Sequence, residues 1–221
     1  MQNIFSIYRR WHDPVTSLKR AVVLTISILL VEALGFFLKD RLSFISPIYL
    51  LGFLRTVDIF ILLIFGPWSF KRPDISDVIM DCLYASLFFS MGGLFFLMTW
   101  KFFSGSSMLK AGDILMHKHY PLLFAFYITS CLLSPVAEEL FFRGILYRKM
   151  REKWSIIISV LVLSSLFALI HLYFSGQGLV PFAGSLIFCF GYEKTKFILA
   201  PVLLHIIGNS IIYLSPFLNF I

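Results

Sequence analysis

Long, uninterrupted apolar segments constrain the fold of this chain more than any other feature. They recur from Ala21 onward, only 14% of the residues are charged, and the mean hydropathy is +0.88. A soluble domain carries about 25% charged residues and could not bury this much apolar surface. The runs are continuous and not alternating, which argues against a β-barrel. The sequence therefore predicts an all-α, polytopic transmembrane helical bundle.

A helix needs about 20 apolar residues to cross a bilayer, and this length divides the chain into about seven candidate spans. We expect them at residues 21–38, 46–66, 78–100, 120–147, 155–174, 179–191 and 197–218. Charges interrupt the second span, and the sixth is short. We expect one integral membrane domain, with N-terminal spans and a short interfacial helix in residues 1–120 and a helical core in residues 121–221.

The distribution of basic residues predicts the orientation in the membrane. They cluster before the first span, in the 67–76 loop, and after the fourth and sixth spans, which all fall on one side if seven spans alternate. Because basic loops face the cytoplasm, we expect a cytoplasmic N-terminus in a multi-pass protein of the cell membrane. The basic loop 101–119 is the exception. This pattern explains the net charge of +7 without a nucleic-acid partner.

Ionisable side chains inside a span cost roughly 2.5 kcal/mol or more at its centre, so each one needs an explanation. Arg55 and Asp58 are three residues apart and can pair with each other. Glu32 has no evident partner in the sequence. His117 and His119 fall in a predicted loop, where exposure to water explains them better than metal binding does.

Glu138 and Glu139 are harder to explain. Glu139 and Arg143 have i, i+4 spacing, so they share a helix face and can pair. Glu138 is rotated from that face by about 100° and has no cation nearby in the sequence. A carboxylate in such apolar surroundings suits general acid–base chemistry near neutral pH. In the alternative interpretation, the Glu139–Arg143 pair is structural and Glu138 is a spectator.

Two further helical pairs carry polar groups into apolar spans. Phe167 and His171 share a face of the fifth span, and His205 and Asn209 share a face of the seventh. Taken singly, each pair is explained by helix packing. Together with Glu138 they could converge in one cavity. There, a Glu and a His can polarise a water, and a His and an Asn can donate hydrogen bonds to a developing oxyanion. These groups are the minimum needed to hydrolyse an amide inside a membrane.

The segments EELFFRG, FALIH and YEKTKFILAPVLLHIIGN resemble the CPBP family of intramembrane proteases. That family includes the type II CAAX prenyl proteases and bacterial Abi-like, bacteriocin-immunity-type proteins. Its pattern is EExxxR, FxxxH and HxxxN or HxxxD on three successive helices, and the match spans roughly residues 134–209. The resemblance implies that Glu138 is the catalytic base, that His171 helps to activate water, and that His205 and Asn209 stabilise the oxyanion.

The resemblance also implies a supporting role for Glu139, Arg143 and Phe167. One departure concerns Ser185 and Cys189, which stand where the family often has glycines four residues apart. Both residues are small, so close helix packing is still expected.

Helix depth raises a difficulty for this arrangement. His171 lies about 24 Å from the expected cytoplasmic end of its span, and Glu138 lies only about 15 Å from Arg148, at 1.5 Å per residue. Because proline interrupts helices, we expect a break at Pro135 that lets Glu138 begin a new helix.

The predicted function is a glutamate-type intramembrane endopeptidase that needs no cofactor and cuts a membrane-associated protein or peptide. One alternative is a zinc protease that uses Glu138, His171 and His205 as ligands, although no HExxH motif is present. Others are a non-catalytic immunity or scaffold protein, and a transporter, for which the expected internal repeats are not visible.

Overall fold

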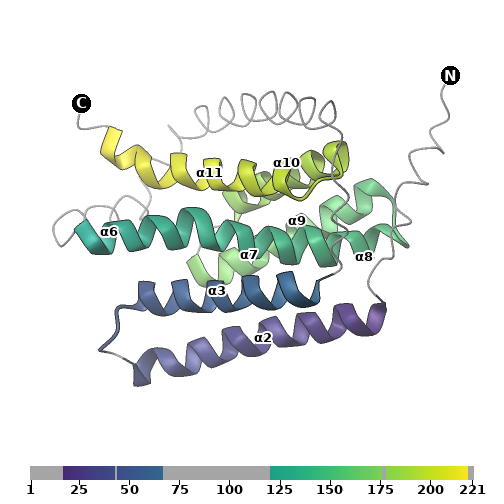
Figure 1. The fold of residues 1–221 in the computed structure, drawn as a ribbon. Coiled ribbons are helices and arrows are strands. Elements are labelled where there is room, and N and C mark those ends of the chain that lie inside the picture. The colour runs from purple at the N-terminus through teal and green to yellow at the C-terminus, as the bar shows by residue number, and fades with distance from the viewer. Residues whose placement is uncertain (1–16, 43, 67–119, 176–177, 219–221) are drawn as a thin grey trace.

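The computed structural model describes residues 17–42, 44–66, 120–175 and 178–218, and every regular element in these ranges is a helix (Figure 1). The predicted all-α class is therefore confirmed. The predicted interfacial helix, the third span (78–100), His117 and His119 lie outside the described residues. The elements, with π-helical turns labelled η, are α2 (Leu18–Arg41), α3 (Pro47–Phe65), α6 (Tyr120–Tyr127), η2 (Ile128–Leu133), α7 (Ser134–Phe141), η3 (Phe142–Tyr147), α8 (Arg148–Arg151), α9 (Ile156–Ser175), α10 (Leu179–Thr195) and α11 (Leu199–Leu218).

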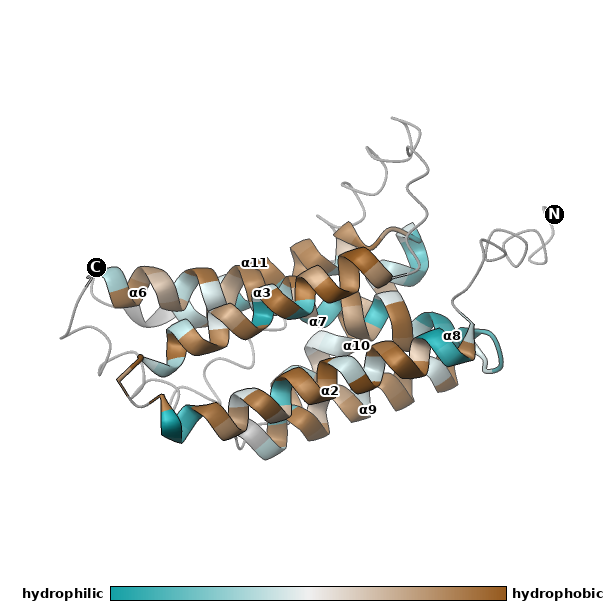
Figure 2. Ribbon diagram, turned by 60° about the horizontal axis from the view of Figure 1, so that its bottom comes forward, coloured by the Kyte–Doolittle hydropathy of each residue, from teal (hydrophilic) through white to brown (hydrophobic). Residues whose placement is uncertain are grey.

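The described helices have the length and surface of membrane spans. Four are long and apolar enough to cross a bilayer, namely Leu18–Arg41, Pro47–Phe65, Pro121–Arg151 and Ile156–Tyr173, and Leu199–Tyr213 is a shorter apolar helix. Figure 2 shows that apolar residues dominate these helices, and the apolar side chains extend to the outer surface, where Phe36 is 75% exposed. Six of the predicted spans coincide with helices. The count of seven, the cytoplasmic N-terminus and the division at residue 120 stay predictions.

The predicted break at Pro135 is wrong, because the fourth span is one helix from Pro121 to Arg151. A π-helical segment precedes the proline, and the amide of Ser134 donates to the carbonyl of Thr129, five residues back. We attribute the unbroken helix at Pro135 to this wider turn, because it leaves room for the proline ring next to the preceding turn of backbone.

The depths of Glu138 and His171 agree without a break because the helix continues past Arg148 to Arg151. Glu138 lies about 20 Å from that end of the helix, and His171 lies about 22 Å from the start of α9, at 1.5 Å per residue. The expected mismatch came from ending the fourth span too early.

Helix α3 packs against α2, η2 and α7. Gly52 permits the close approach to η2, since a Cβ there would lie 2.8 Å from Oγ1 of Thr129. Further along, Leu62 shares a buried cluster with Leu140 and Ile145. Helix α3 thus runs in the same direction as the fourth span (Figure 1), so its central residues lie beside the start of α7.

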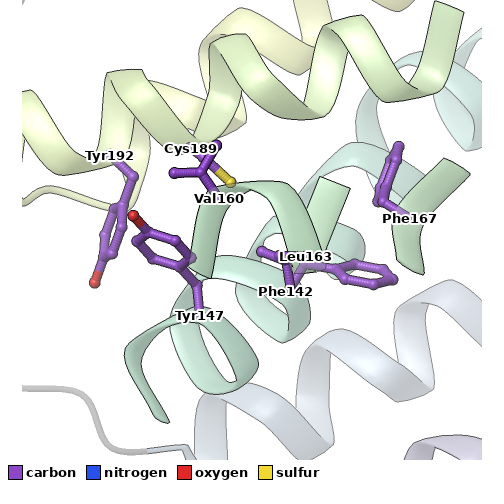
Figure 3. Packing of buried hydrophobic residues seen from close by; sticks show 7 residues of the cluster. All are labelled: Phe142, Tyr147, Val160, Leu163, Phe167, Cys189 and Tyr192. Atoms are coloured by element: carbon purple, nitrogen blue, oxygen red, sulfur yellow. The ribbon is translucent and has the colours of Figure 1, made fainter. Parts of the chain in front are cut away.

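A second buried cluster joins η3, α9 and α10. Figure 3 shows its members, with the rings of Tyr147 and Tyr192 beside each other at a centroid distance of 6.0 Å. The cluster comprises Phe142, Tyr147, Val160, Leu163, Phe167, Cys189 and Tyr192. It fixes the positions of η3 and α9, which carry the candidate site residues Arg143, Phe167 and His171.

A polar cluster closes the bundle at the end where α2 begins and α8 lies (Figure 1). Oε1 of Glu193, in the last turn of α10, accepts hydrogen bonds from Tyr147 Oη at 2.7 Å and Arg151 Nε at 2.6 Å, and Glu193 also pairs with Lys196. Burial would raise the pKa of Glu193, but hydrogen bonds from Lys196, Tyr147 and Arg151 outweigh burial and hold this pKa below its usual range. Arg151 of α8 and Lys196, the residue after α10, thus meet at Glu193 at one end of the bundle.

Candidate active site

The predicted pair of Glu139 and Arg143 is present and completely buried. Nη1 of Arg143 donates to Oε1 of Glu139 at 2.8 Å, and both side chains are 0% exposed. Isolated charges in an apolar interior carry a large desolvation cost, which mutual pairing offsets only when the geometry is good. The pair therefore fixes the orientation of the Glu139 carboxylate.

The same carboxylate oxygen orients His205 on α11. Nδ1 of His205 lies 2.8 Å from Oε1 of Glu139. An ionised carboxylate only accepts hydrogen bonds, so Nδ1 carries the proton and the other ring nitrogen, Nε2, is turned away from Glu139. The ring stacks on Phe188 at a centroid distance of 4.6 Å. His205 is thus held by a hydrogen bond and by a ring face.

His171 on α9 is oriented in a similar way by its own helix. Nδ1 lies 2.9 Å from the carbonyl oxygen of Phe167, which can only accept, so Nδ1 donates. The rings of Phe167 and His171 lie 4.3 Å apart with planes tilted by 30°. In neutral imidazole the lone pair is then on Nε2, which lies 3.9 Å from Oε2 of Glu138 on α7.

Glu138 lies where the two histidines meet. Its Oε2 is 3.9 Å from Nε2 of His171 and 3.9 Å from Nε2 of His205. These separations exceed hydrogen-bond length, and Oε2 is buried without a hydrogen-bond partner among the described residues. Buried polar atoms are nearly always satisfied, so an exception calls for a functional explanation. Three of the four predicted catalytic residues therefore converge around one carboxylate oxygen.

Asn209, the fourth predicted catalytic residue, contacts the backbone of the neighbouring helix. Its Nδ2 donates to the carbonyl of Ser130 at 3.0 Å. In the π-helical register that carbonyl would pair with the amide of residue 135, which is a proline and has no N–H. Asn209 thus satisfies an oxygen that Pro135 leaves without a donor. One amide hydrogen of Asn209 is not used in this bond.

Phe167 and Ser185 complete the surroundings of Arg143. The guanidinium carbon lies 5.3 Å from the ring centroids of both Phe167 and Phe188. Nη2 donates to the carbonyl of Ser185 at 3.0 Å and to its hydroxyl at 2.5 Å. Sequence reasoning treated Ser185 only as a small packing residue. A buried arginine has five N–H donors and requires more acceptors than one carboxylate offers. This requirement could have predicted a hydroxyl acceptor on a neighbouring helix.

A second set of charged side chains, of which only Asp58 is fully buried, joins α2 and α3. Nη1 of Arg55 contacts Oε1 of Glu32 and donates to Oδ2 of Asp58 at 2.9 Å. The predicted pairing of Arg55 with Asp58 is confirmed, and Glu32 receives the partner that the sequence did not reveal. The sequence could have indicated this pairing, because an acidic side chain inside one span is expected to pair with a basic side chain on another.

The arrangement does not decide between the zinc alternative and a glutamate-type site. Among the described residues, no three His, Cys, Asp or Glu side chains are placed to hold a metal ion. The ring nitrogens of His171 and His205 that do not face Glu138 are both engaged in hydrogen bonds.

Comparison with known proteins adds one finding. Residues 120–211 match the family model described as type II CAAX prenyl endopeptidase Rce1-like. The match covers all the predicted catalytic residues and contains residues 134–209, the segment from which the resemblance was inferred. No curated protein and no solved structure matches the chain.

Proposed function

We propose that the chain, whose residues 120–211 match the type II CAAX prenyl endopeptidase family model, is a CPBP-type intramembrane protease of the glutamate type that cuts a peptide bond within the membrane. It is a multi-pass membrane protein with several apolar helices, so its substrate must reach the site from the lipid or from the membrane surface. The family description suggests a prenylated CAAX terminus as the first substrate to try.

One observation carries this proposal, namely the unpartnered Oε2 of Glu138 between the Nε2 atoms of His171 and His205. Two hydrogen bonds of about 2.8 Å can meet across a gap of 3.9 Å, so one water fits between Glu138 and His171. Glu138 accepts a proton from this water, and the water oxygen attacks the carbonyl carbon of the substrate. The proton then passes from Glu138 to the amide nitrogen as the C–N bond breaks.

The oxyanion formed in this step needs donors. The Nδ1–H of His205 donates a hydrogen bond to Glu139, so His205 can donate a second hydrogen bond from Nε2 only in its doubly protonated form. Asn209 has a second amide hydrogen beyond the one bonded to Ser130. Glu139, Arg143 and Phe167 act indirectly, because they hold the rings of the two histidines.

The test is cleavage of a farnesylated peptide ending in a CAAX sequence by the purified protein in lipid vesicles. We expect Glu138→Gln to abolish cleavage and to leave the amount of folded protein unchanged. Glu152→Gln is the matched control, because Glu152 pairs with Lys149 at the end of α8, away from the site. Full cleavage by Glu138→Gln would refute the assignment of the base.

The same assay separates the alternatives. A zinc enzyme would contain stoichiometric metal, and its cleavage would disappear on chelation and return with zinc; we expect cleavage to survive chelation. A non-catalytic relative would bind the peptide and leave it intact. Absence of cleavage across prenylated and unprenylated membrane peptides would favour that reading.

A further inference from the structure

Arg55 has a donor edge that neither of its acidic partners uses. Its contacts with Glu32 and Asp58 both come from Nη1. Nε is buried and has no hydrogen-bond partner among the described residues, and no contact of Nη2 occurs there either. Nε and Nη2 form the side of a guanidinium that binds planar oxygen acceptors with two parallel hydrogen bonds. A partly buried arginine with this side unused is unusual inside a membrane span.

Arg55 lies on the face of α3 that packs against η2 and α7, and α7 carries Glu138. Gly52, Arg55 and Ile59 share one face of α3, at i, i+3 and i+7. Gly52 approaches Thr129 of η2, and Ile59 packs on the cluster that contains Leu140 of α7. Arg55, which lies between Gly52 and Ile59, is therefore at the same level of the bundle as the turns of η2 and α7 that lead to Glu138.

Electrostatics agree with this placement. The charge of Arg55 interacts with that of Glu138 as well as with Glu32 and Asp58. The side chain of Arg55 is 19% exposed and that of Glu138 is 18% exposed, so neither is sealed off completely.

We propose that the Nε–Nη2 edge of Arg55 binds a main-chain carbonyl oxygen of the peptide substrate next to the bond that Glu138 attacks. This inference rests on the proposed function and extends the site beyond residues 120–211. It assigns a substrate-binding role to α3, outside the segment that matches the protease family.

The charge balance selects a carbonyl over a second carboxylate. Glu32 and Asp58 already pair with the single positive charge of Arg55. Adding an anion would place three acids around one guanidinium in apolar surroundings, which is costly. A neutral carbonyl oxygen has two lone pairs, accepts both N–H groups, and adds no charge. A substrate in extended conformation offers such oxygens on either side of the bond to be cut.

The experiment measures binding apart from turnover. The dissociation constant of the farnesylated CAAX peptide is determined for Glu138→Gln and for the same protein carrying Arg55→Lys. Lysine keeps a positive charge for Glu32 and Asp58 but has no planar edge. We expect the dissociation constant to rise about tenfold to a hundredfold, as for loss of hydrogen bonds to a charged group. Arg41→Gln, in the exposed last turn of α2, is the control and should leave it unchanged.

A second variant covers the case in which Arg55→Lys folds poorly. The triple change Glu32→Gln, Arg55→Gln and Asp58→Asn removes the charges together, so no buried charge of the set is left unpaired. It should accumulate normally and show the same loss of binding. If either folded variant binds the peptide as tightly as its parent, Glu32, Arg55 and Asp58 serve only to hold α2 and α3 together, and the proposal is overturned.

A final comparison uses the peptide with a terminal carboxamide in place of the carboxylate. Arg55→Lys should weaken binding of both peptides equally. If the effect of Arg55→Lys disappears with the amide, Arg55 binds the terminal carboxylate and the carbonyl assignment is wrong. Failure of the unmodified protein to cleave would count against the proposed function alone, because these binding constants do not depend on turnover.

Discussion

Glu139→Gln is the change that most directly tests how the site is built. Oε1 of Glu139 accepts hydrogen bonds from Nη1 of Arg143 and Nδ1 of His205, each at 2.8 Å. Glutamine keeps the shape of the side chain but removes its charge, which leaves Arg143 buried without its counter-ion. Breaking a buried ion pair in this way costs about 3–5 kcal/mol. We therefore expect the free energy of unfolding to fall by about that amount.

Glu138→Gln provides the internal comparison, because the two glutamates are adjacent and chemically identical. Oε2 of Glu138 has no hydrogen-bond partner among the described residues, so its replacement should change the free energy of unfolding by less than about 1 kcal/mol. One variant should thus lose stability, and the other should lose catalysis alone.

Thermal unfolding in detergent micelles, with cleavage measured on the same samples, distinguishes these effects. For a chain of this size, a loss of 3–5 kcal/mol lowers Tm by roughly 6–20 °C. Combining Glu139→Gln with Arg143→Met should recover most of this loss, since no unpaired charge then remains. If Glu139→Gln unfolds at the same temperature as the unmodified protein, or Glu138→Gln is destabilised equally, the two glutamates do not divide their roles as described.

Three further predictions concern residues around the site and at the end of the bundle. Ser185→Ala removes the hydroxyl that lies 2.5 Å from Nη2 of Arg143, and it should cost about 1–3 kcal/mol in thermal unfolding, with Ser185→Thr milder; equal stability of all three proteins would contradict this. Asn209→Ala should lower kcat roughly a hundred- to a thousandfold if the amide serves the oxyanion. If the amide only satisfies the carbonyl of Ser130, the folded fraction should keep near-normal kcat and the yield should fall. Glu193 has a lowered pKa in the folded state, so its contribution to stability is present above its unfolded pKa and is lost as pH falls through the folded one. Tm should therefore decline below about pH 4, and Glu193→Gln should reduce that decline.

Periodicity predicted those parts of the site that lie within one helix. The i, i+4 spacing placed Glu139 against Arg143 and Phe167 against His171, and both contacts occur. The i, i+3 spacing of Arg55 and Asp58 was equally informative. Such pairs depend only on helical geometry, which every span shares whatever its neighbours are.

Contacts between helices were predicted less well. The sequence did not show that Glu32 pairs with Arg55, that Ser185 accepts from Arg143, or that Asn209 bonds to Ser130. Each joins residues on different helices, so it depends on the rotation and depth of both. The predicted break at Pro135 failed for a related reason. Proline disfavours a regular α-helical turn, but a π-helical turn and a donor from α11 accommodate it.

The sequence by itself determined that this protein is a helical membrane protein and which residues were candidates for its chemistry, because apolar length and charge inside a span are readable without a partner. Tertiary structure alone decided how the two adjacent glutamates differ. Glu139 meets Arg143 and His205, whereas Oε2 of Glu138 is left between His171 and His205 without a hydrogen bond. That difference arises because α9, α10 and α11 pack against the helix that carries both glutamates and decide which side chains face each of them. The local sequence does not show which neighbouring helix will face which glutamate.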